Sequence, residues 1–295
     1  TSDFALAGRS LPLPMVITAT FATWFGSETI LGLPGRFIES GIAGVIEEPF
    51  GSGMALILVG TFFAHKLYKQ NILTLGDYYR DRYGRSVELL CSVAIVISYL
   101  GWVGAQVTAL GLVINLITEG AVSMTTGMVI GAAVVLAYTM VGGMWSVAMT
   151  DFVQMIVIVV GLVAILWFAT DLAGGMDKVV DYARGRDLFH AFPEPTTTGW
   201  LFWISAAMTM MIGSIPQQDV FQRVMSAKNL PTAVAGPILG GSFYILFAFV
   251  PMFIVVAAIL VMPDAAEKML SEDPQQLLPT LVRDYMPMWL RVVFF

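Results

Sequence analysis

Apolar residues are gathered along this chain into long runs that are separated by shorter polar segments. Each run holds about 20 residues or more, the length that an α-helix needs to cross a bilayer, whereas strands of a membrane barrel alternate over about 10 residues. The pattern therefore predicts an all-α transmembrane protein with seven spans and the start of an eighth near Met288. The predicted spans cover residues 11–33, 45–64, 87–117, 122–141, 146–170, 200–221 and 234–262.

The first run is interrupted in its middle. From Phe25 to Thr29 the sequence reads FGSET, and the apolar residues resume only at Ile30. In hydrocarbon each unpaired backbone group costs several kcal/mol, and a lone charge such as that of Glu28 costs at least a few more. We therefore predict a helix in two halves, whose freed carbonyls and amides form a binding site at mid-membrane depth.

The sixth run is interrupted in the same way. It is apolar as far as Ile212, and Gly213, Ser214 and Pro216 then precede three polar residues at 217–219. An odd number of crossings separates the two broken runs, so they enter the membrane from opposite sides. Broken helices at matching positions in two oppositely oriented halves are typical of an inverted-repeat transporter with its site between them.

Charged residues indicate the orientation in the membrane. Lysine and arginine are enriched in cytoplasmic connections, so we expect the connections after the second and sixth spans to be cytoplasmic. They contain Lys66, Lys69, Arg80, Arg82, Arg85, Arg223 and Lys228, and Arg9 precedes the first span. The acidic connections at 171–199 and 263–287 are expected outside. Residues 275–285, bounded by two prolines, are predicted to form a short interfacial helix.

Composition limits the class of protein. Hydrophobic residues make up 57% of the chain and charged residues 12%, which excludes a soluble globular domain. The net charge of −6 says little about partners, because the acids lie mostly in outer connections. The expected partners are the lipid bilayer, a small solute and Na⁺, and nucleic acid is not suggested. Cys91 is the single cysteine, and His65 and His190 lack metal-ligand spacing, so we expect neither an enzyme nor a bound cofactor. The chain starts without methionine and stops inside an apolar run, and we interpret it as a fragment.

Five motifs follow one another along the chain: AGRSLP (7–12), GLPG (32–35), LGDYYRDRYG (75–84), VGGMWSVAMTDFVQ (141–154) and QRVMSAK (222–228). They resemble the sodium:solute symporter family, which includes carriers of sugars, proline and choline. The resemblance implies a LeuT-type 5+5 inverted-repeat fold, present here in part as core helices 1–7 and the start of 8. Residues 1–295 are then a single membrane domain truncated at both ends, with a first five-helix repeat at 11–171 and an incomplete second repeat at 200–295.

The resemblance also implies where the coupling ion binds. In the family Na⁺ is held by carbonyls of the first broken helix, which are here those of Ala22 and Phe25, and by hydroxyls of core helix eight, which lie beyond Phe295. Carbonyl oxygens freed by a break suit such a hard cation; the alternative is that Gly26 only permits a packing kink. Asp151 resembles an aspartate on the family's ion exit route, although it also fits a helix-start acid near the cytoplasmic face.

The solute site is expected to combine tryptophans with polar residues of the breaks. TATFATWFG, YLGWVGAQ and GSIPQQDVFQRV resemble choline-transporter-like members, which implies that Trp24 and Trp102 form part of an aromatic cage for an amine. The alternative is that both rings face lipid or the core. Gln217 and Gln218 either hydrogen-bond the solute or mark re-entry into the cytoplasmic interface. Choline carriers have an aromatic residue at Gln217 and sugar carriers share only Gln218, so the solute itself stays open.

Three acidic residues near the first break have competing interpretations. Glu28 is a candidate solute contact, because an intramembrane carboxylate must pair with something and a positively charged substrate group is one option. Gly26, in the break itself, is a further candidate contact. For Glu28, protonation or a partner such as Arg36 is the other option. Glu47 and Glu48 come just before a proline, which also fits an acidic first helical turn at the outer interface.

Together these features predict a sodium-coupled secondary active symporter of the plasma membrane, in a bacterium the inner membrane. It is expected to import a small zwitterion or cation, such as a quaternary amine or an amino acid, by alternating access. Coupling requires that Na⁺ bind better to the solute-ready state than to the other. A transporter-like sensor module of a signalling protein and a proton-coupled carrier are the alternatives. The oligomeric state is left open.

Overall fold

The computed structural model describes residues 2–295, and within this range all regular elements are helices. The first predicted span is broken, as expected. After α1 (Ser2–Leu6) and η1 (Ala7–Arg9), helix α2 (Leu13–Trp24) ends at the FGS segment. A short π-helical turn, η2 (Glu28–Gly32), then leads into α3 (Leu33–Gly44).

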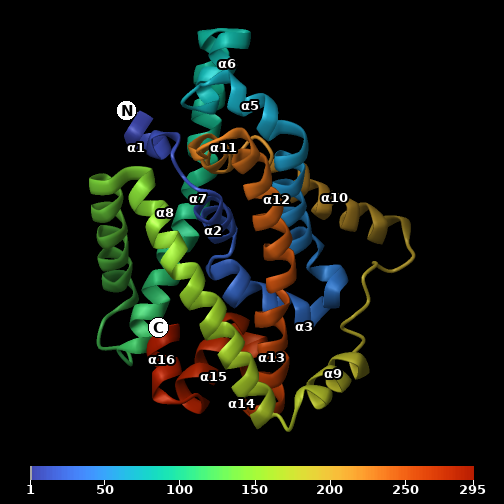
Figure 1. Cartoon of the computed structure of the whole chain (residues 1–295). Helices are drawn as coiled ribbons and strands as arrows, with labels where there is room; N and C mark the ends of the chain where they lie inside the picture. The colour runs from blue at the N-terminus through green and yellow to red at the C-terminus, as the bar shows by residue number, and fades with distance from the viewer. Residues whose placement is uncertain (1) are drawn as a thin grey trace.

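The next elements complete the first part of the bundle. One continuous span consists of η3 (Ile46–Gly51), α4 (Ser52–Leu58), η4 (Val59–Phe63) and α5 (Ala64–Gln70). Helix α6 (Leu75–Tyr83) is capped by Thr74 and precedes the long α7 (Arg85–Ile117). Helix α8 (Met124–Leu172) contains a non-helical residue, Gly143, with φ 55°. In Figure 1 the chain rises along the first part of α8, turns and descends along the second, so α8 comprises two spans.

The second part begins with α9 (Met176–Gly185) and the second broken helix. Helix α10 (Thr197–Gly213) and helix α11 (Gln218–Ser226) meet at an angle of 44°. In Figure 1 the chain descends from α2 to α3 and rises from α10 to α11. The remaining elements are α12 (Leu230–Phe247), α13 (Phe249–Val261), α14 (Pro263–Glu272), η5 (Pro274–Gln276), α15 (Leu277–Tyr285) and α16 (Met288–Phe294).

The observed helices account for the seven predicted spans. Within residues 2–295, four helices are long and apolar enough to cross a membrane, and the bent pair α10–α11 makes five. The turn at Gly143 divides α8 into two spans, and α2 with α3 supplies the remaining broken one. The division into two repeats, at 11–171 and 200–295, stays a prediction.

The ends of the bundle separate the charges as the sequence predicts. Figure 1 places α1, α5, α6 and α11, which belong to the basic segments, at one end of the molecule, and α9, α14 and α15, from the acidic connections, at the other. The positive-inside rule assigns the first end to the cytoplasm.

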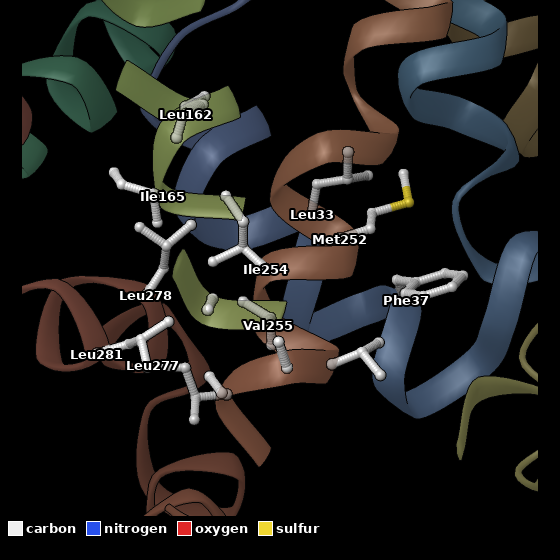
Figure 2. Packing of buried hydrophobic residues seen from close by; sticks show 14 of the residues in the cluster. Leu33, Phe37, Leu162, Ile165, Met252, Ile254, Val255, Leu277, Leu278 and Leu281 are labelled. Atoms are coloured by element: carbon white, nitrogen blue, oxygen red, sulfur yellow. The ribbon is translucent and has the colours of Figure 1, made fainter. Parts of the chain in front are cut away.

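The predicted interfacial helix is more deeply packed than expected. Its counterpart α15 buries a complete apolar face, with Leu277 and Leu281 both 0% exposed. Figure 2 shows Leu277, Leu278 and Leu281 turned toward Ile165 of α8 and Val255 of α13. The helix therefore closes the outer end of the bundle, because its apolar face finds protein partners there instead of lying in the lipid interface alone.

Small residues bring α12 close to its neighbours. A Cβ on Gly241 would lie 2.6 Å from the carbonyl oxygen of Gly53 in α4, and one on Gly236 would lie 2.3 Å from Cγ1 of Val16 in α2. Membrane helices associate through such close approach, since lipid supplies no hydrophobic force between them. Helix α12 thus holds α2, and with it the first break, against the second span.

Candidate functional site

The first break interrupts the backbone ladder over three residues. Phe25, at the end of α2, has φ −83° and ψ 72°, and the amide of Gly26 donates to the carbonyl of Trp24 at 3.0 Å instead of to a carbonyl four residues back. The regular pattern resumes when the amide of Ile30 donates to Gly26 O at 3.1 Å. The ring of Phe25 is buried and stacks on Phe21 at 4.7 Å, so its side chain anchors the break while its backbone forms it.

The second break lies between α10 and α11. Gln217 precedes α11 in an extended conformation, with φ −82° and ψ 139°, and its side chain forms no cap of the helix. The amide of Gln217 donates to Ser214 O at 3.3 Å, which closes the turn between the two halves. As a result Gln217 and the first turn of α11 face the region of the first break.

A cavity of about 230 Å³ lies between the two breaks. Its lining comes from the first break, α3, η3, α7, α10 and the second break. The residues are Thr23, Trp24, Gly26, Glu28, Arg36, Glu47, Glu48, Ser98, Tyr99, Trp102, Gln106, Met210, Gln217 and Asp219. The interrupted helices thus face one shared polar pocket, as their sequences predicted.

Five of the six predicted solute contacts meet in this cavity: Trp24, Gly26, Glu28, Trp102 and Gln217. Gln218 is the exception and is not among the lining residues. Its Oε1 accepts the amide of Leu75 at 2.9 Å and so ties α11 to the start of α6. Gln218 is the first residue of α11, and its side chain leaves the helix toward the basic end of the bundle.

Glu28 has an internal partner. Nη2 of Arg36 lies 3.6 Å from Oε1 of Glu28, and Nη1 lies 3.9 Å from Oε2 of Glu47, with all three side chains between one third and one half exposed. One guanidinium is thus shared by two carboxylates at the outer part of the cavity. The arrangement agrees with the alternative of an Arg36 partner, while the place of Glu28 in the cavity lining keeps a solute contact open.

Glu48 is a buried residue of the cavity lining. The sequence left open a solute contact or an acidic first helical turn at the outer interface; Glu48 does lie in the first turn of η3, but its side chain is only 7% exposed. Its Oε1 accepts from the hydroxyl of Tyr244 at 2.5 Å and from that of Thr29 at 3.0 Å. The burial has a physical reason: donors from α12 and from η2 satisfy the carboxylate, so it can lie inside the bundle. A hint was available, because Glu48 falls within a predicted span.

Tyr99 and Asp219 form a second pair that sequence reasoning did not identify. The Tyr99 hydroxyl donates to Oδ1 of Asp219 at 2.5 Å and accepts the backbone amide of Asp219 at 3.0 Å. The Tyr99 ring also contacts Trp102 edge-on, with centroids 6.2 Å apart. The available signal was spacing: Tyr99 precedes Trp102 by three residues and therefore shares its face of α7.

The proposed sodium ligands border a neighbouring pocket. Ala22 and Phe25 line a space of about 340 Å³ together with residues of α8 and α16, among them Gln154 and Val293. Gly26 lines both this pocket and the solute cavity. Backbone oxygens at the interrupted ladder are the ligand type that Na⁺ takes, so the geometry is compatible with the predicted site.

Asp151 lies apart from both pockets, in the second part of α8. Its Oδ2 is buried and has no hydrogen-bond partner among residues 2–295. A place on an ion route therefore stays a prediction. Within the same described range, no cluster of three or more His, Cys, Asp or Glu side chains could hold a metal ion.

A membrane bundle with two oppositely running broken helices and a polar cavity between them defines a secondary transporter fold. The family model of the sodium:solute symporter family matches residues 4–295, and the chain belongs to this family. Because that match covers nearly the whole chain, the expected family is confirmed.

Relatives and a solved structure agree with this assignment. The chain is 29% identical over 258 residues to high-affinity choline transporter 1 of Caenorhabditis elegans (86% of this chain, 43% of the relative). It is 30% identical over 231 residues to the human high affinity choline transporter 1 (76% and 38%), and 28% identical over 276 residues to sodium/glucose cotransporter 4 of Danio rerio (86% and 41%). It thus spans about two fifths of these relatives. The fold matches the substrate-bound outward-open state of a Na⁺-coupled sialic acid symporter, with TM-score 0.84 and 18% identity over 99% of this chain and 63% of that one.

Proposed function

We propose that the protein is a sodium-coupled secondary active symporter that imports a small zwitterion or cation by alternating access across the plasma membrane, in a bacterium the inner membrane. The observation that carries this proposal is the single cavity into which both helix breaks, four carboxylates and two tryptophans converge. Membership of the symporter family and the choline and glucose carriers among the relatives support it.

The proposed cycle assigns each break a role. Na⁺ enters from outside and binds the carbonyls of Ala22 and Phe25, while the solute binds between Trp24, Trp102 and Gln217. Because Gly26 borders both pockets, an ion that orders the break also fixes one wall of the solute cavity. Sodium then favours the solute-ready conformation, and by linkage the solute favours sodium to the same extent. Both are released on the cytoplasmic side once one part of the bundle has moved against the other.

Uptake into liposomes tests the proposal. The full-length protein is reconstituted, and solute accumulation is measured with an inward Na⁺ gradient and, separately, with an inward H⁺ gradient at equal Na⁺. We expect accumulation with the Na⁺ gradient only. Uptake that ignores Na⁺ would overturn the mechanism.

Proton coupling is the second candidate because Glu48 is a buried carboxylate in the cavity lining. Such groups are often members of proton relays in carriers. The same two gradients separate the candidates, since a proton-coupled carrier accumulates solute with the H⁺ gradient alone. The Glu48→Gln variant distinguishes the two coupling mechanisms further. A proton-coupled carrier loses its H⁺-driven uptake in this variant, while a sodium-coupled carrier keeps its Na⁺-dependent uptake.

A further inference from the structure

The inner part of the solute cavity contains a carboxylate that is fixed in place by a second helix. Asp219 lies in the first turn of α11, and the Tyr99 hydroxyl of α7 bonds both its backbone amide and its Oδ1. A helix leaves its first amides without internal partners, so Tyr99 also caps α11. Within the described part of the chain no hydrogen bond reaches Oδ2 of Asp219. The residue lines the cavity and retains one oxygen for a ligand.

The charge of Asp219 is not neutralised by a basic side chain. Arg36 is engaged with Glu28 and Glu47 at the other end of the cavity. Arg223 follows Asp219 by one turn, but its guanidinium donates to the carbonyls of Asp219 and Ala19, at 3.2 and 3.4 Å, and not to the carboxylate. Among residues 2–295, Asp219 forms no salt bridge. A carboxylate that lines a cavity without a cationic partner favours a ligand that brings one.

Aromatic rings stand beside this carboxylate. Trp102 contacts the Tyr99 ring edge-on, and Trp24 lines the same cavity from the first break. Indole faces attract ammonium groups of every degree of methylation, whereas a carboxylate oxygen gains a charge-assisted hydrogen bond only from a group that carries N–H. The rings alone therefore suit any ammonium, and Asp219 adds a preference for those that retain hydrogen on nitrogen.

We propose that Asp219 is the ammonium-binding residue of this cavity, held in position by Tyr99, and that the substrate carries an amine with N–H hydrogens instead of a quaternary nitrogen. The inference rests on the proposed symport function and specifies its substrate class. The volume of about 230 Å³ limits the ligand to a small molecule.

A methylation series provides the test. Ethanolamine, its N-methyl and N,N-dimethyl derivatives and its N,N,N-trimethyl derivative, choline, share one positive charge at neutral pH but carry successively fewer N–H groups. Binding to the purified full-length protein in saturating Na⁺ is followed by tryptophan fluorescence or calorimetry. We expect affinity to fall along the series, with choline about tenfold weaker than ethanolamine, as for one lost charge-assisted hydrogen bond. Choline bound as tightly as ethanolamine would overturn the inference.

Variants assign the preference to the residue. Asp219→Asn keeps an acceptor for Tyr99 but removes the charge. We expect this variant to bind ethanolamine about tenfold or more weakly than the wild type does, and to bind ethanolamine and choline with equal affinity. Tyr99→Phe removes the hydroxyl that holds the Asp219 carboxylate in position, and we expect it to weaken ethanolamine binding to a smaller extent. Asp171→Asn, the same change at an exposed position at the end of α8, serves as the matched control and leaves the whole series unchanged.

The outcomes separate this inference from the function on which it rests. If amines bind more tightly with Na⁺ but Asp219→Asn binds them like the wild type, the inference fails and symport stands. If only neutral solutes bind in a sodium-dependent way, the inference and the proposed zwitterion or cation both fail, while sodium-coupled symport stands. If no solute in the series or in a panel of sugars and amino acids responds to Na⁺, the proposed symport function fails. Should Asp219→Asn not fold, the affinities of the wild-type protein for the methylation series still decide whether an amine with N–H hydrogens is preferred over a quaternary nitrogen.

Discussion

Replacing Tyr244 by phenylalanine removes one hydroxyl from the middle of the helix bundle and leaves the ring in place. The hydroxyl is fully buried and donates to Oε1 of Glu48, and the ring packs edge-on against Phe21 and Phe25 with centroids 6.4 and 6.1 Å away. The hydroxyl also forms a hydrogen bond with Oγ1 of Thr29 at 3.1 Å. The ring contacts persist in Tyr244→Phe, so the measured change reports the hydrogen bonds of the hydroxyl.

The expected loss of stability in Tyr244→Phe depends on how deeply the hydroxyl is buried and on the strength of hydrogen bonds between helices in a membrane. A hydrogen bond to a charged group contributes about 1.5–3 kcal/mol in soluble proteins, but interhelical bonds in membranes average about 0.6 and reach about 1.7 kcal/mol. Water cannot replace the lost donor at a fully buried site, although Thr29 remains as a donor to Glu48. We therefore expect Tyr244→Phe to lower the free energy of unfolding by about 1–2 kcal/mol.

Reversible denaturant titration of the full-length protein in mixed micelles measures this change, with the exposed Tyr285→Phe as the matched control. Thr29→Val removes the other donor to Glu48, and the double variant leaves the buried carboxylate without either. Because the two donors share one acceptor, the double loss should exceed the sum of the single losses by about 0.5 kcal/mol or more. Unfolding free energies of Tyr244→Phe and wild type that agree within about 0.3 kcal/mol would refute the buried network.

Three further changes test other parts of the structure. Gly241→Ala places a methyl group 2.6 Å from the carbonyl of Gly53, so it should lower the unfolding free energy by about 1–3 kcal/mol, and an unchanged denaturation midpoint would contradict the close helix contact. Glu28→Gln should weaken the binding of a monovalent cation by at most about 1 kcal/mol, or fivefold, because the Glu28 carboxylate is half exposed and already pairs with the Arg36 guanidinium. Unchanged affinity for all transported cations would exclude a solute contact. Gln218→Ala removes the acceptor of the Leu75 amide, so the unfolding free energy should fall by about 0.5–1.5 kcal/mol while solute affinity stays within twofold. Unchanged stability with weakened solute binding would show instead that Gln218 contacts the solute.

The sequence predicted those parts of the fold that depend on local composition. A polar interruption of an apolar run has one low-energy solution in a bilayer, which is a broken helix around a wet space, so the breaks at Phe25 and Ser214 could be inferred directly. The turn at Gly143 was predictable for the same reason, since two apolar runs of spanning length meet there. Membrane orientation rests on charge alone and stays a prediction.

The pairings inside the cavity could not be inferred in this way. Glu48 meets Tyr244 across 196 positions of sequence, and Tyr99 meets Asp219 across 120. A sequence gives the approximate depth of each side chain in the membrane, but which faces of two helices meet depends on their packing. The position of Glu48 just before a proline suits a helix start, which it occupies in η3, but the sequence does not show that the carboxylate is buried; only its donors on other helices do.

Gln218 shows the same limit within a single polar run. Residues 217–219 are equally polar, yet Gln217 and Asp219 line the cavity while Gln218 bonds to Leu75 on the opposite side. Gln218 and Asp219 both belong to α11, where successive side chains point about 100° apart, so the two need not face the same pocket. The helix starts at Gln218, and this register, which composition does not reveal, decides the role of each residue.

Neighbouring residues of the first break border two different pockets, which gives the proposed coupling between ion and solute binding a local physical basis. Ala22 and Phe25 border the proposed ion pocket, Trp24 and Glu28 border the solute cavity, and Gly26 belongs to both. These residues share one interrupted stretch of backbone, so ordering it for one ligand reduces the conformational entropy that the other must still lose. The buried bonds of Thr29 to Glu48, and of Glu48 to α12, hold the far side of this stretch in place. An ion bound at the proposed site would therefore act on the cavity between the breaks through the backbone itself, without a distant relay.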